Sequence, residues 1–586
     1  LDGTLLERKW IYYDGAIRPE TPPARGDATR LVLWWDFEGN PGDDPDTVAP
    51  PVESVSSPDA GPMEDLTHRN PSYSMTYDSV GNPLTLVEGS GAETVFEYDD
   101  GDPATRWDAL LLGPAREIDA MGHAREFEID PVSGRVVREV DPNGTRWRTS
   151  YDAFGRKTGE YVEAAGEPET TLATVEFAFV GEPGVVRNEI TVVRHVDPEG
   201  DAGTSMVSKV YLDGLGRAYR ASVADGGGRT ILQTASFDAQ GRVESESSPY
   251  REGSEEPRYR KLEFGVEGEL EREILPDGVT IEHDGHASHR SVIVRAAGGA
   301  IVRRSSVRVN GQGQIVEVSE HENPVGPPSG VTRYARNPLG EVEKVFDAVA
   351  VARGWSANTA GERRHVTTIT RDSLGRRTSI DDPDGGLRTF VHDGAGDLVQ
   401  SIDAEGESVV ASYDRLHRPA WIASSIAGDP ILNFYWDDPE AGAVGRLSRA
   451  ISSDAVTGKI LAEDRYRYNG TGGLRLEERR IDGFVLRTEY AYDLLDRVTD
   501  VLHPDGDRII YKYGLGPEIR SISREMQGAP AVILRSAEYD GRSRPTSVAL
   551  GGKDTGTPAW DYRVEREYDS ATGRMNAYRV AGEGRS

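Results

Sequence analysis

Residues 371–418 read RDSLGRRTSIDDPDGGLRTFVHDGAGDLVQSIDAEGESVVASYDRLHR, and this stretch decides the fold. It contains three copies of one pattern: Asp, two variable residues, Gly or a substitute for Gly, and a polar residue that is usually Arg. The copies begin at Asp372, Asp393 and Asp414, so they recur at steps of about 21 residues. Self-similarity at a fixed short period is typical of repeat proteins.

The same pattern recurs along the chain, usually with an aromatic residue before the Asp. Clear copies are Tyr77-Asp78-Ser-Val-Gly81-Asn82, Tyr151-Asp152-Ala-Phe-Gly155-Arg156 and Phe237-Asp238-Ala-Gln-Gly241-Arg242. The copies Arg371-Asp372-Ser-Leu-Gly375-Arg376 and His392-Asp393-Gly-Ala-Gly396-Asp397 lack the aromatic residue. Copies with one extra residue are Tyr211-Leu-Asp213-Gly-Leu-Gly216-Arg217 and Tyr568-Asp569-Ser-Ala-Thr-Gly573-Arg574. Copies without the Gly are Tyr413-Asp414-Arg-Leu-His417-Arg418, Tyr492-Asp493-Leu-Leu-Asp496-Arg497 and Tyr539-Asp540-Gly-Arg-Ser543-Arg544.

A second turn signal falls between these copies. It occurs at Asp141-Pro-Asn-Gly144, Asp382-Pro-Asp-Gly385, Pro276-Asp-Gly278 and Pro504-Asp-Gly506. Pro presets φ for a turn, and Gly supplies a positive φ. A short alternating run follows each signal, such as 145–151 or 508–513, and such runs predict strands. One unit is therefore strand, turn, strand, turn, strand, and the chain is expected to be a long ribbon of β-hairpins.

Each residue type of the motif has a physical role in this interpretation. The Asp carboxylate can accept hydrogen bonds from backbone N–H groups two residues on, which closes a turn. The Gly lies where a left-handed backbone would penalise a Cβ by about 1–2 kcal/mol. The Tyr is expected to pack against its counterpart in the adjacent hairpin, and the Arg can pair with neighbouring acids. No long window has a helical apolar period, so the fold is expected to be almost entirely β, with repeats stacked on their neighbours.

Composition excludes several classes of protein. The 586 residues include no Cys, which rules out disulfides, zinc–thiolate sites and a cysteine nucleophile. A formal net charge of -32 would repel phosphate backbones and anionic lipid surfaces, which argues against nucleic acid as a partner. The most apolar runs, 31–35 and 348–352, are only strand-sized, so no membrane-spanning segment is expected.

The two ends of the chain suggest a piece of a longer protein. The sequence begins Leu-Asp-Gly-Thr without a Met, a basic region or an apolar signal region, and it stops just after a repeat. Any export signal is therefore expected outside this chain. Residues 1–76 are rich in Pro, Gly and Asp and carry Trp10, Trp34 and Trp35, so we interpret them as an irregular β lead-in. Residues 77–586 form the expected repeat region.

The series Tyr-Asp-x-x-Gly-Arg at steps of about 21 residues resembles the YD repeat of the Rhs family, over residues 77–578. Residues 210–250, with Tyr-Leu-Asp-Gly-Leu-Gly-Arg followed by Phe-Asp-Ala-Gln-Gly-Arg and Ser-Ser-Pro-Tyr, further resemble the middle region of Tc-toxin B components. The resemblance implies that the ribbon spirals into a large hollow shell, or cocoon. It also implies that the shell holds a cytotoxic C-terminal segment, in an unfolded or poorly folded state, until delivery.

The resemblance also implies binding partners and a cellular location for the protein. The implied partners are an enclosed C-terminal toxin polypeptide and other subunits of a toxin complex, and the implied location is secreted or extracellular, from a bacterium. In Rhs shells an Asp-Pro-x-Gly-Leu segment ends the core and undergoes self-cleavage. The segment most similar to it in this sequence is Asp382-Pro-Asp-Gly-Gly-Leu387. Because this segment has an extra Gly and lies between ordinary repeats, we predict that it forms a turn. The toxin module expected after the core is absent from this sequence.

Several other groups of residues could form metal or catalytic sites, but purely structural roles are favoured for them. His283, His286 and His289 could bind zinc, yet their spacing favours polar residues on a hairpin tip. The clusters Asp43-Asp44-Pro-Asp46 and Asp99-Asp100-Gly-Asp102 could hold calcium, yet neither completes a known loop. No Walker A loop, Gly-x-Ser-x-Gly elbow or His-Glu-x-x-His motif occurs. No catalytic residue, cofactor or metal site is predicted.

Two functional hypotheses follow. The leading one is a non-enzymatic Rhs/YD shell that encloses a toxic effector. The alternative is a cell-surface adhesion or carbohydrate-binding YD-repeat protein, because a series of Tyr residues could stack sugars as well as pack hairpins. An enzyme in its own right has no supporting constellation in the sequence.

Overall fold

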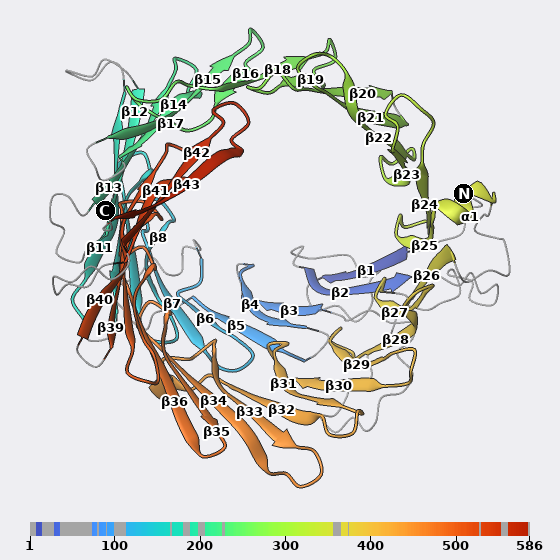
Figure 1. Cartoon of the computed structure of the whole chain (residues 1–586). Coiled ribbons are helices and arrows are strands. Elements are labelled where there is room, and N and C mark those ends of the chain that lie inside the picture. The colour runs from blue at the N-terminus through green and yellow to red at the C-terminus, as the bar shows by residue number, and fades with distance from the viewer. Residues whose placement is uncertain are drawn as a thin grey trace. The chain divides into compact units, whose positions relative to one another are not determined.

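The computed structural model describes residues 7–13, 28–35, 73–78, 81–88, 91–98, 113–164, 167–179, 188–196, 205–224, 229–286, 288–354, 365–372, 374–526, 529–551 and 561–583. These residues form strands almost throughout (Figure 1). The all-β prediction is therefore confirmed. Within the described residues, no helix is long and apolar enough to cross a membrane.

The strands follow one another with short connections. As far as β22 they are β1 (Glu7–Tyr13), β2 (Ala28–Trp35), β3 (Tyr73–Tyr77), β4 (Pro83–Val87), β5 (Glu93–Glu97), β6 (Arg116–Ile118), β7 (Ala124–Ile129), β8 (Val136–Val140), β9 (Arg146–Tyr151), β10 (Lys157–Glu163), β11 (Thr170–Ala178), β12 (Asn188–His195), β13 (Ser205–Leu212), β14 (Ala218–Ala224), β15 (Thr230–Phe237), β16 (Val243–Ser247), β17 (Tyr250–Arg251), β18 (Tyr259–Phe264), β19 (Leu270–Ile274), β20 (Thr280–His286), β21 (His289–Arg295) and β22 (Ile301–Val309). The remaining strands are β23 (Ile315–His321), β24 (Gly330–Arg336), β25 (Val342–Phe346), β26 (Val366–Arg371), β27 (Arg377–Asp382), β28 (Gly386–His392), β29 (Leu398–Ile402), β30 (Ser408–Tyr413), β31 (Pro419–Ser424), β32 (Pro430–Trp436), β33 (Leu447–Asp454), β34 (Ile460–Tyr468), β35 (Leu474–Ile481), β36 (Phe484–Tyr492), β37 (Val498–Leu502), β38 (Arg508–Tyr513), β39 (Ile519–Met526), β40 (Ala529–Tyr539), β41 (Pro545–Leu550), β42 (Asp561–Tyr568) and β43 (Met575–Glu583).

Most consecutive strands pair in antiparallel fashion, as expected for a ribbon of hairpins. Ser401 in β29, for example, lies opposite Phe390 in β28 and opposite Val409 in β30. Two pairings skip a neighbour, β15 with β17 and β16 with β18. Hairpins suit this sequence because turn signals separate strands of five to nine residues along most of the chain.

A bulge recurs beside the motif turns. Tyr413 pairs with Pro419, whereas Ser412 pairs with Trp421, so Ala420 is an extra residue on its strand. The same shift accompanies other copies of the motif, at Tyr77, Tyr151, Tyr492, Tyr539 and Tyr568. A bulge increases the local right-handed twist of a hairpin. The repeat therefore carries a built-in source of twist at each motif turn.

The chain divides into two compact units, each assembled from two separate stretches of sequence. Unit 1 comprises Leu1–Gly144 and Thr332–Asp464, and unit 2 comprises Thr145–Val331 and Arg465–Ser586. In the expected lead-in, β1 pairs with β2, and β2 pairs with β3. The predicted boundary between residues 76 and 77 stays a prediction.

The described residues bury little apolar surface. Buried apolar side chains are scattered along the strands, and the largest side chains that are less than 2 % exposed are the polar Thr145 and Ser247. A sheet in which so many side chains stay half-exposed has little hydrophobic interior.

One apolar run forms a helix where the sequence suggested a strand-sized segment. Residues Ala348–Ala352 form the short helix α1, because the Asp347 carboxylate accepts hydrogen bonds from the backbone N–H groups of Val349 and Ala350, both at 2.9 Å. Such an N-cap offsets the unfavourable start of a helix. The other apolar run, 31–35, lies in β2 as expected. A single 3₁₀ turn, η3 (Pro439–Ala441), precedes β33.

Candidate functional site: motif turns and contacts between distant strands

The motif turn is closed by its Asp at both the backbone and the side chain. At Asp152, the backbone N–H donates to the carbonyl oxygen of Arg156 at 2.9 Å, and the N–H of Gly155 donates back to the Asp152 carbonyl at 2.9 Å. The Asp152 Oδ1 atom accepts from the N–H groups of Phe154 and Arg156, both at 2.9 Å. The Arg156 Nε atom donates to Oδ2 at 2.6 Å. One carboxylate therefore satisfies three donors, as the sequence suggested for the turn.

The same arrangement recurs at the other copies in both units. A motif Asp accepts from the backbone N–H of the motif Arg and from its Nε atom at Asp213, Asp238, Asp372, Asp414, Asp493 and Asp540. Asp78 and Asp393 instead accept from the backbone of Asn82 and Asp397. At Asp569 the backbone and hydroxyl of Thr572 donate to the carboxylate. The backbone N–H of Arg217, opposed by partial burial and helped by its guanidinium, holds the pKa of Asp213 below its usual range.

The position before the motif Arg has a left-handed backbone whether or not it is Gly. Gly155 has a φ of 73° and Gly216 a φ of 79°. His417, Asp496 and Ser543 replace Gly in the three degenerate copies, and their φ values are 60°, 56° and 57°. A side chain in this region is strained. The turn is therefore retained in these copies at a local conformational cost.

The motif Arg also contacts the next hairpin. Its guanidinium lies over the aromatic ring that ends the following pair of strands, with distances from Cζ to the ring centroid of 4.3–4.9 Å. The pairs are Arg156 with Phe177, Arg217 with Phe237, Arg242 with Phe264, Arg418 with Trp436, Arg497 with Tyr513 and Arg544 with Tyr568. Such cation–π contacts contribute about 0.5–1 kcal/mol at partly exposed sites. The structure shows a guanidinium as the partner of these rings, where the sequence suggested a second Tyr.

Where that ring belongs to Tyr or Trp, its hydroxyl or indole N–H also donates to a backbone carbonyl just after the preceding turn. The Tyr513 hydroxyl donates to the carbonyl of Val498 at 2.8 Å, and the Tyr568 hydroxyl donates to the carbonyl of Pro545 at 3.1 Å. Each of these carbonyls belongs to the residue that follows a motif Arg. Equivalent bonds join Tyr413 to Leu398, Trp436 to Pro419, Tyr492 to Leu474 and Tyr539 to Ile519. Trp436, Tyr513 and Tyr568 are therefore each held by two contacts with the previous repeat.

Several turns of the same kind occur at positions that the repeat motif does not cover. Asx-capped turns also occur at Asp119, Asn310, Asn337, Asp403 and Asn469, each with Gly three residues later. All five lack the following Arg, and of the five only Asn469 has a preceding Tyr, Tyr468. The shorter signal Asx-x-x-Gly, between alternating runs, would have found them.

Among the described residues of unit 1, three contacts join strands that are far apart in the sequence. The His417 ring lies 2.9 Å from Asp397 Oδ2 and 3.2 Å from Glu88 Oε2, which is 329 positions away. The His123 ring lies 2.8 Å from Asp119 Oδ2 and 3.4 Å from Asp437 Oδ2.

The third contact of unit 1 is reciprocal. The Asn143 side-chain amide donates to the Val444 carbonyl at 3.0 Å, and the Val444 N–H donates back to Asn143 Oδ1 at 2.9 Å. Because Asn143 belongs to the predicted turn Asp141-Pro-Asn-Gly144, this turn signal also serves a long-range contact.

Unit 2 has its own contacts of this kind. The Thr145 hydroxyl donates to the carbonyl of Gly470, 325 positions away. The Gly541 N–H donates to the Glu255 carboxylate at 3.0 and 3.2 Å. A Cβ added at Gly541 would lie 2.7 Å from the backbone Cα atom of Tyr250. In each unit, motif turns of the later stretch therefore contact the earlier stretch directly.

The other predicted candidates take ordinary places. His286 is paired in register with His289 where β20 meets β21, and His283 Nε2 lies 3.2 Å from Glu273 Oε1. Within the described residues, no group of three potential metal ligands gathers. The clusters at 43–46 and 99–102 lie outside the described residues. Asp382 accepts from the N–H groups of Asp384 and Gly385 at the turn between β27 and β28, which confirms the turn prediction there.

Comparison with known proteins agrees with the repeat. The RHS repeat family matches residues 132–168 and 371–410, which include the copies at Asp152, Asp372 and Asp393. No curated protein sequence matches the chain.

Solved structures match over most of the chain. A crystal structure of TcdB2–TccC3 matches with a TM-score of 0.69 and 13% identity, covering 87% of this chain and 29% of that one. TcdB2–TccC3–Cdc42 matches with a TM-score of 0.74 and 12% identity, covering 98% of this chain and 34% of that one. A Tc holotoxin pore from Photorhabdus luminescens, with a TccC3 mutation, matches with a TM-score of 0.76 and 12% identity, also covering 98% and 34%. This chain thus spans about a third of the length of the chains it matches; it contains two matches to the RHS repeat family and has the fold of the TcdB2–TccC3 structures.

Proposed function

We propose that this chain is a wall segment of a hollow Rhs/YD shell that encloses a C-terminal toxic effector polypeptide for delivery. The observation that carries the proposal is the similarity to TcdB2–TccC3–Cdc42 over 98% of this chain. Assembly with other toxin-complex subunits and release from a bacterial cell are parts of the same proposal. A match to a Tc holotoxin pore supports them.

The contacts described above suit a wall. Several repeats are tied to the next by a guanidinium over a ring and by a side-chain hydrogen bond to a carbonyl, as at Arg497 and Tyr513. Each unit is also tied across the sequence, as at Asn143 and Val444 in unit 1 and at Glu255 and Gly541 in unit 2. A wall needs such cross-links and no reacting group. We therefore propose a non-enzymatic role, with the motif residues as structural residues of the wall.

The test is an electron-microscopy reconstruction of the chain purified together with its natural downstream sequence. The same chain without that sequence is the control. A closed shell with internal density that is present only in the longer protein would support enclosure. A rod or flat ribbon without a lumen would exclude it.

Exposed aromatic side chains favour a second candidate, a cell-surface adhesion or carbohydrate-binding protein. Phe154 is 83 % exposed and Tyr578 is 66 % exposed. Aromatic faces of this kind can stack on sugar rings. A glycan array tests this function with the wild-type chain and with Phe154→Ala and Tyr578→Ala variants. Binding that both substitutions reduce would support adhesion, and no binding above background would exclude it.

A further inference from the structure

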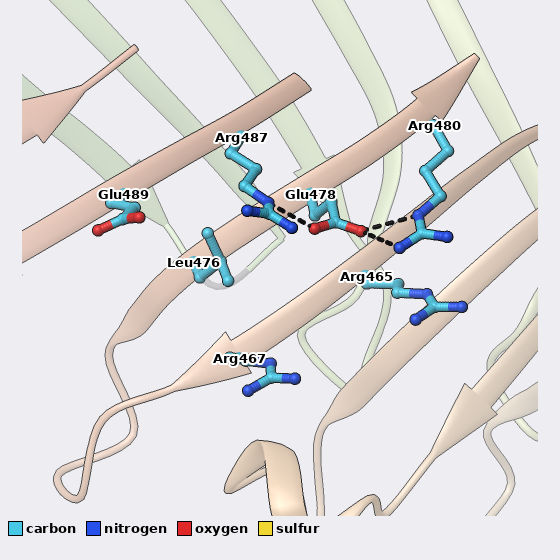
Figure 2. A pocket seen from close by; sticks show the side chains of 7 residues that line it. All are labelled: Arg465, Arg467, Leu476, Glu478, Arg480, Arg487 and Glu489. Atoms are coloured by element: carbon cyan, nitrogen blue, oxygen red, sulfur yellow. Dashed lines mark hydrogen bonds and ion pairs between the residues drawn. The ribbon is translucent and has the colours of Figure 1, made fainter. Parts of the chain in front are cut away.

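Unit 2 contains a groove that is rich in arginine, although the chain as a whole is strongly acidic. The groove has a volume of about 350 Å³ and lies on β34, β35 and β36 (Figure 2). Its charged lining residues are Arg465, Arg467, Glu478, Arg480, Arg487 and Glu489. Four guanidinium groups therefore face two carboxylates, in a chain whose net charge is -32.

Strand alternation places these side chains on one face. Successive residues of a strand point to opposite faces, so Arg465 and Arg467 of β34 share a face. In the β35–β36 hairpin, Glu478 lies directly opposite Arg487, with Arg480 two residues along on the same strand. The side chains at these positions gather over one side of the sheet (Figure 2).

A buried carboxylate fixes two of the four arginines. Glu478 is only 7 % exposed, and it accepts hydrogen bonds from Arg487 Nε at 2.7 Å and from Arg480 Nε at 2.8 Å. The hydrogen bond from Arg487, opposed by burial and helped by Arg480, holds the pKa of Glu478 below its usual range. The two guanidinium groups are thereby oriented in advance, while their remaining N–H groups stay available for a ligand.

The other two arginines lie along β34. Arg467 makes no ion pair or hydrogen bond with any residue that the structure describes, and it is exposed. Residues at alternate positions of a strand are about 6.6–6.8 Å apart. The Arg465–Arg467 spacing therefore matches carboxylates at alternate positions of another extended chain, such as Glu-x-Glu. Two phosphates of a pyrophosphate are too close together to match it.

We propose that this groove binds an extended acidic polypeptide segment with carboxylates at alternate positions, through forked contacts with Arg465 and Arg467. The pairing would use planar guanidinium groups against carboxylates, a geometry that Lys cannot reproduce. The proposal is independent of the enclosure of an effector, because binding can be measured on this chain alone.

The experiment is isothermal titration calorimetry with the whole chain and two capped octapeptides. One peptide alternates Glu and Ser, and the other contains four Glu followed by four Ser, so the two have the same composition and charge. We expect the alternating peptide to bind about ten-fold more tightly. We also expect its affinity to fall as salt rises. Equal affinity for the two peptides would overturn the proposal, as would tighter binding of inorganic pyrophosphate.

Variants identify the groove. Arg467→Gln is expected to weaken the binding of the alternating peptide about ten-fold, and Arg467→Lys should recover only part of this lost affinity. Arg579→Gln is the matched control, because Arg579 is also exposed and lies in the same unit on β43, away from the groove. Circular dichroism and thermal melting establish that each variant is folded. An equal effect of Arg467→Gln and Arg579→Gln would place binding elsewhere and overturn the proposal.

Discussion

At the residue scale, the position before the motif Arg controls the turn. Gly155 takes its left-handed backbone without a Cβ, whereas Asp496 takes nearly the same backbone with a side chain. In the described residues no side-chain hydrogen bond of Asp496 offsets the strain. The two positions are therefore suited to opposite substitutions.

Gly155→Val is expected to lower the free energy of unfolding by about 1–3 kcal/mol, because a β-branched residue is strained at a φ of 73°. Asp496→Gly is the reciprocal control and is expected to raise it by about 0.5–1 kcal/mol. Thermal melting and urea denaturation of both variants measure these changes. An unchanged melting temperature in Gly155→Val would contradict the turn geometry at that copy.

His417 adds a dependence on pH. Hydrogen bonds to Asp397 and then Glu88, opposed by partial burial, raise the pKa of His417 above its usual range. A raised pKa in the folded state means that protonation stabilises the protein below the unfolded pKa of about 6.5, and that this stabilisation is lost as pH rises through the folded pKa.

The variant His417→Gly removes both the ion pairs and the strain at a φ of 60°. We expect it to be more stable than the wild type at pH 8.5, and to lose that advantage or become less stable at pH 5.5. Urea denaturation of both proteins across this pH range gives the difference between their free energies of unfolding. Because all other titrating groups are common to the two proteins, their contributions cancel in this difference. A difference that does not change with pH would contradict the role of the charged imidazole.

At the element scale, the contact between neighbouring hairpins is made by an Arg and an aromatic ring. Arg497 Nε donates to Oδ2 of Asp493 in the same turn at 2.7 Å, and Arg497 Cζ lies 4.6 Å from the ring centroid of Tyr513 on the next pair of strands. One side chain therefore closes a turn and connects two hairpins. A long planar guanidinium suits both tasks, which explains why Arg rather than Lys ends most copies.

A double-mutant cycle with Arg497→Lys and Tyr513→Leu is expected to give a coupling energy of about 0.5–1 kcal/mol. Each single variant should also destabilise the protein. Tyr513→Leu loses the ring and its hydroxyl bond to Val498, and Arg497→Lys loses the guanidinium bond to Asp493. Urea denaturation supplies the four free energies. Tyr578→Leu on β43 is the control ring, since it is 66 % exposed, and its coupling to Arg497→Lys should be close to zero.

At the scale of the whole molecule, contacts between distant stretches hold each unit together. Gly541 shows why such a contact is specific. It lies against the backbone of Tyr250 and Arg251, where an added Cβ would meet atoms at 2.7 and 2.8 Å. Gly214 occupies the same place after the Asp of its own motif copy, and there an added Cβ would meet nothing within 4 Å.

Gly541→Ala is therefore expected to destabilise unit 2 by about 1–3 kcal/mol, whereas Gly214→Ala should change stability by less than about 0.5 kcal/mol. Hydrogen exchange gives a sharper measurement than melting alone. Protection should fall around Tyr250 in the Gly541→Ala variant and stay unchanged in the control. Equal effects of the two substitutions would show that the contact between the stretches contributes nothing to stability.

The sequence predicted the local structure well, because turns are set by residues within five positions of one another. The carboxylate bonds at Asp152 follow directly from the motif. The helix at Ala348–Ala352 was not predicted, since its cap at Asp347 outweighs the short apolar run. Long-range partners could not be predicted either. Nothing near Gly541 in the sequence indicates Glu255, because such contacts depend on how the twist of many hairpins accumulates.

The interleaving of the two units has a consequence for synthesis on the ribosome. Unit 1 begins with Leu1–Gly144 but is completed only by Thr332–Asp464, after the first stretch of unit 2 has already been made. Individual hairpins can form as they emerge, since their contacts are local. Final assembly of either unit has to wait for its second stretch. During that interval the nascent chain exposes unpaired surfaces that invite aggregation, so slow translation or a bound chaperone would favour the yield of folded protein.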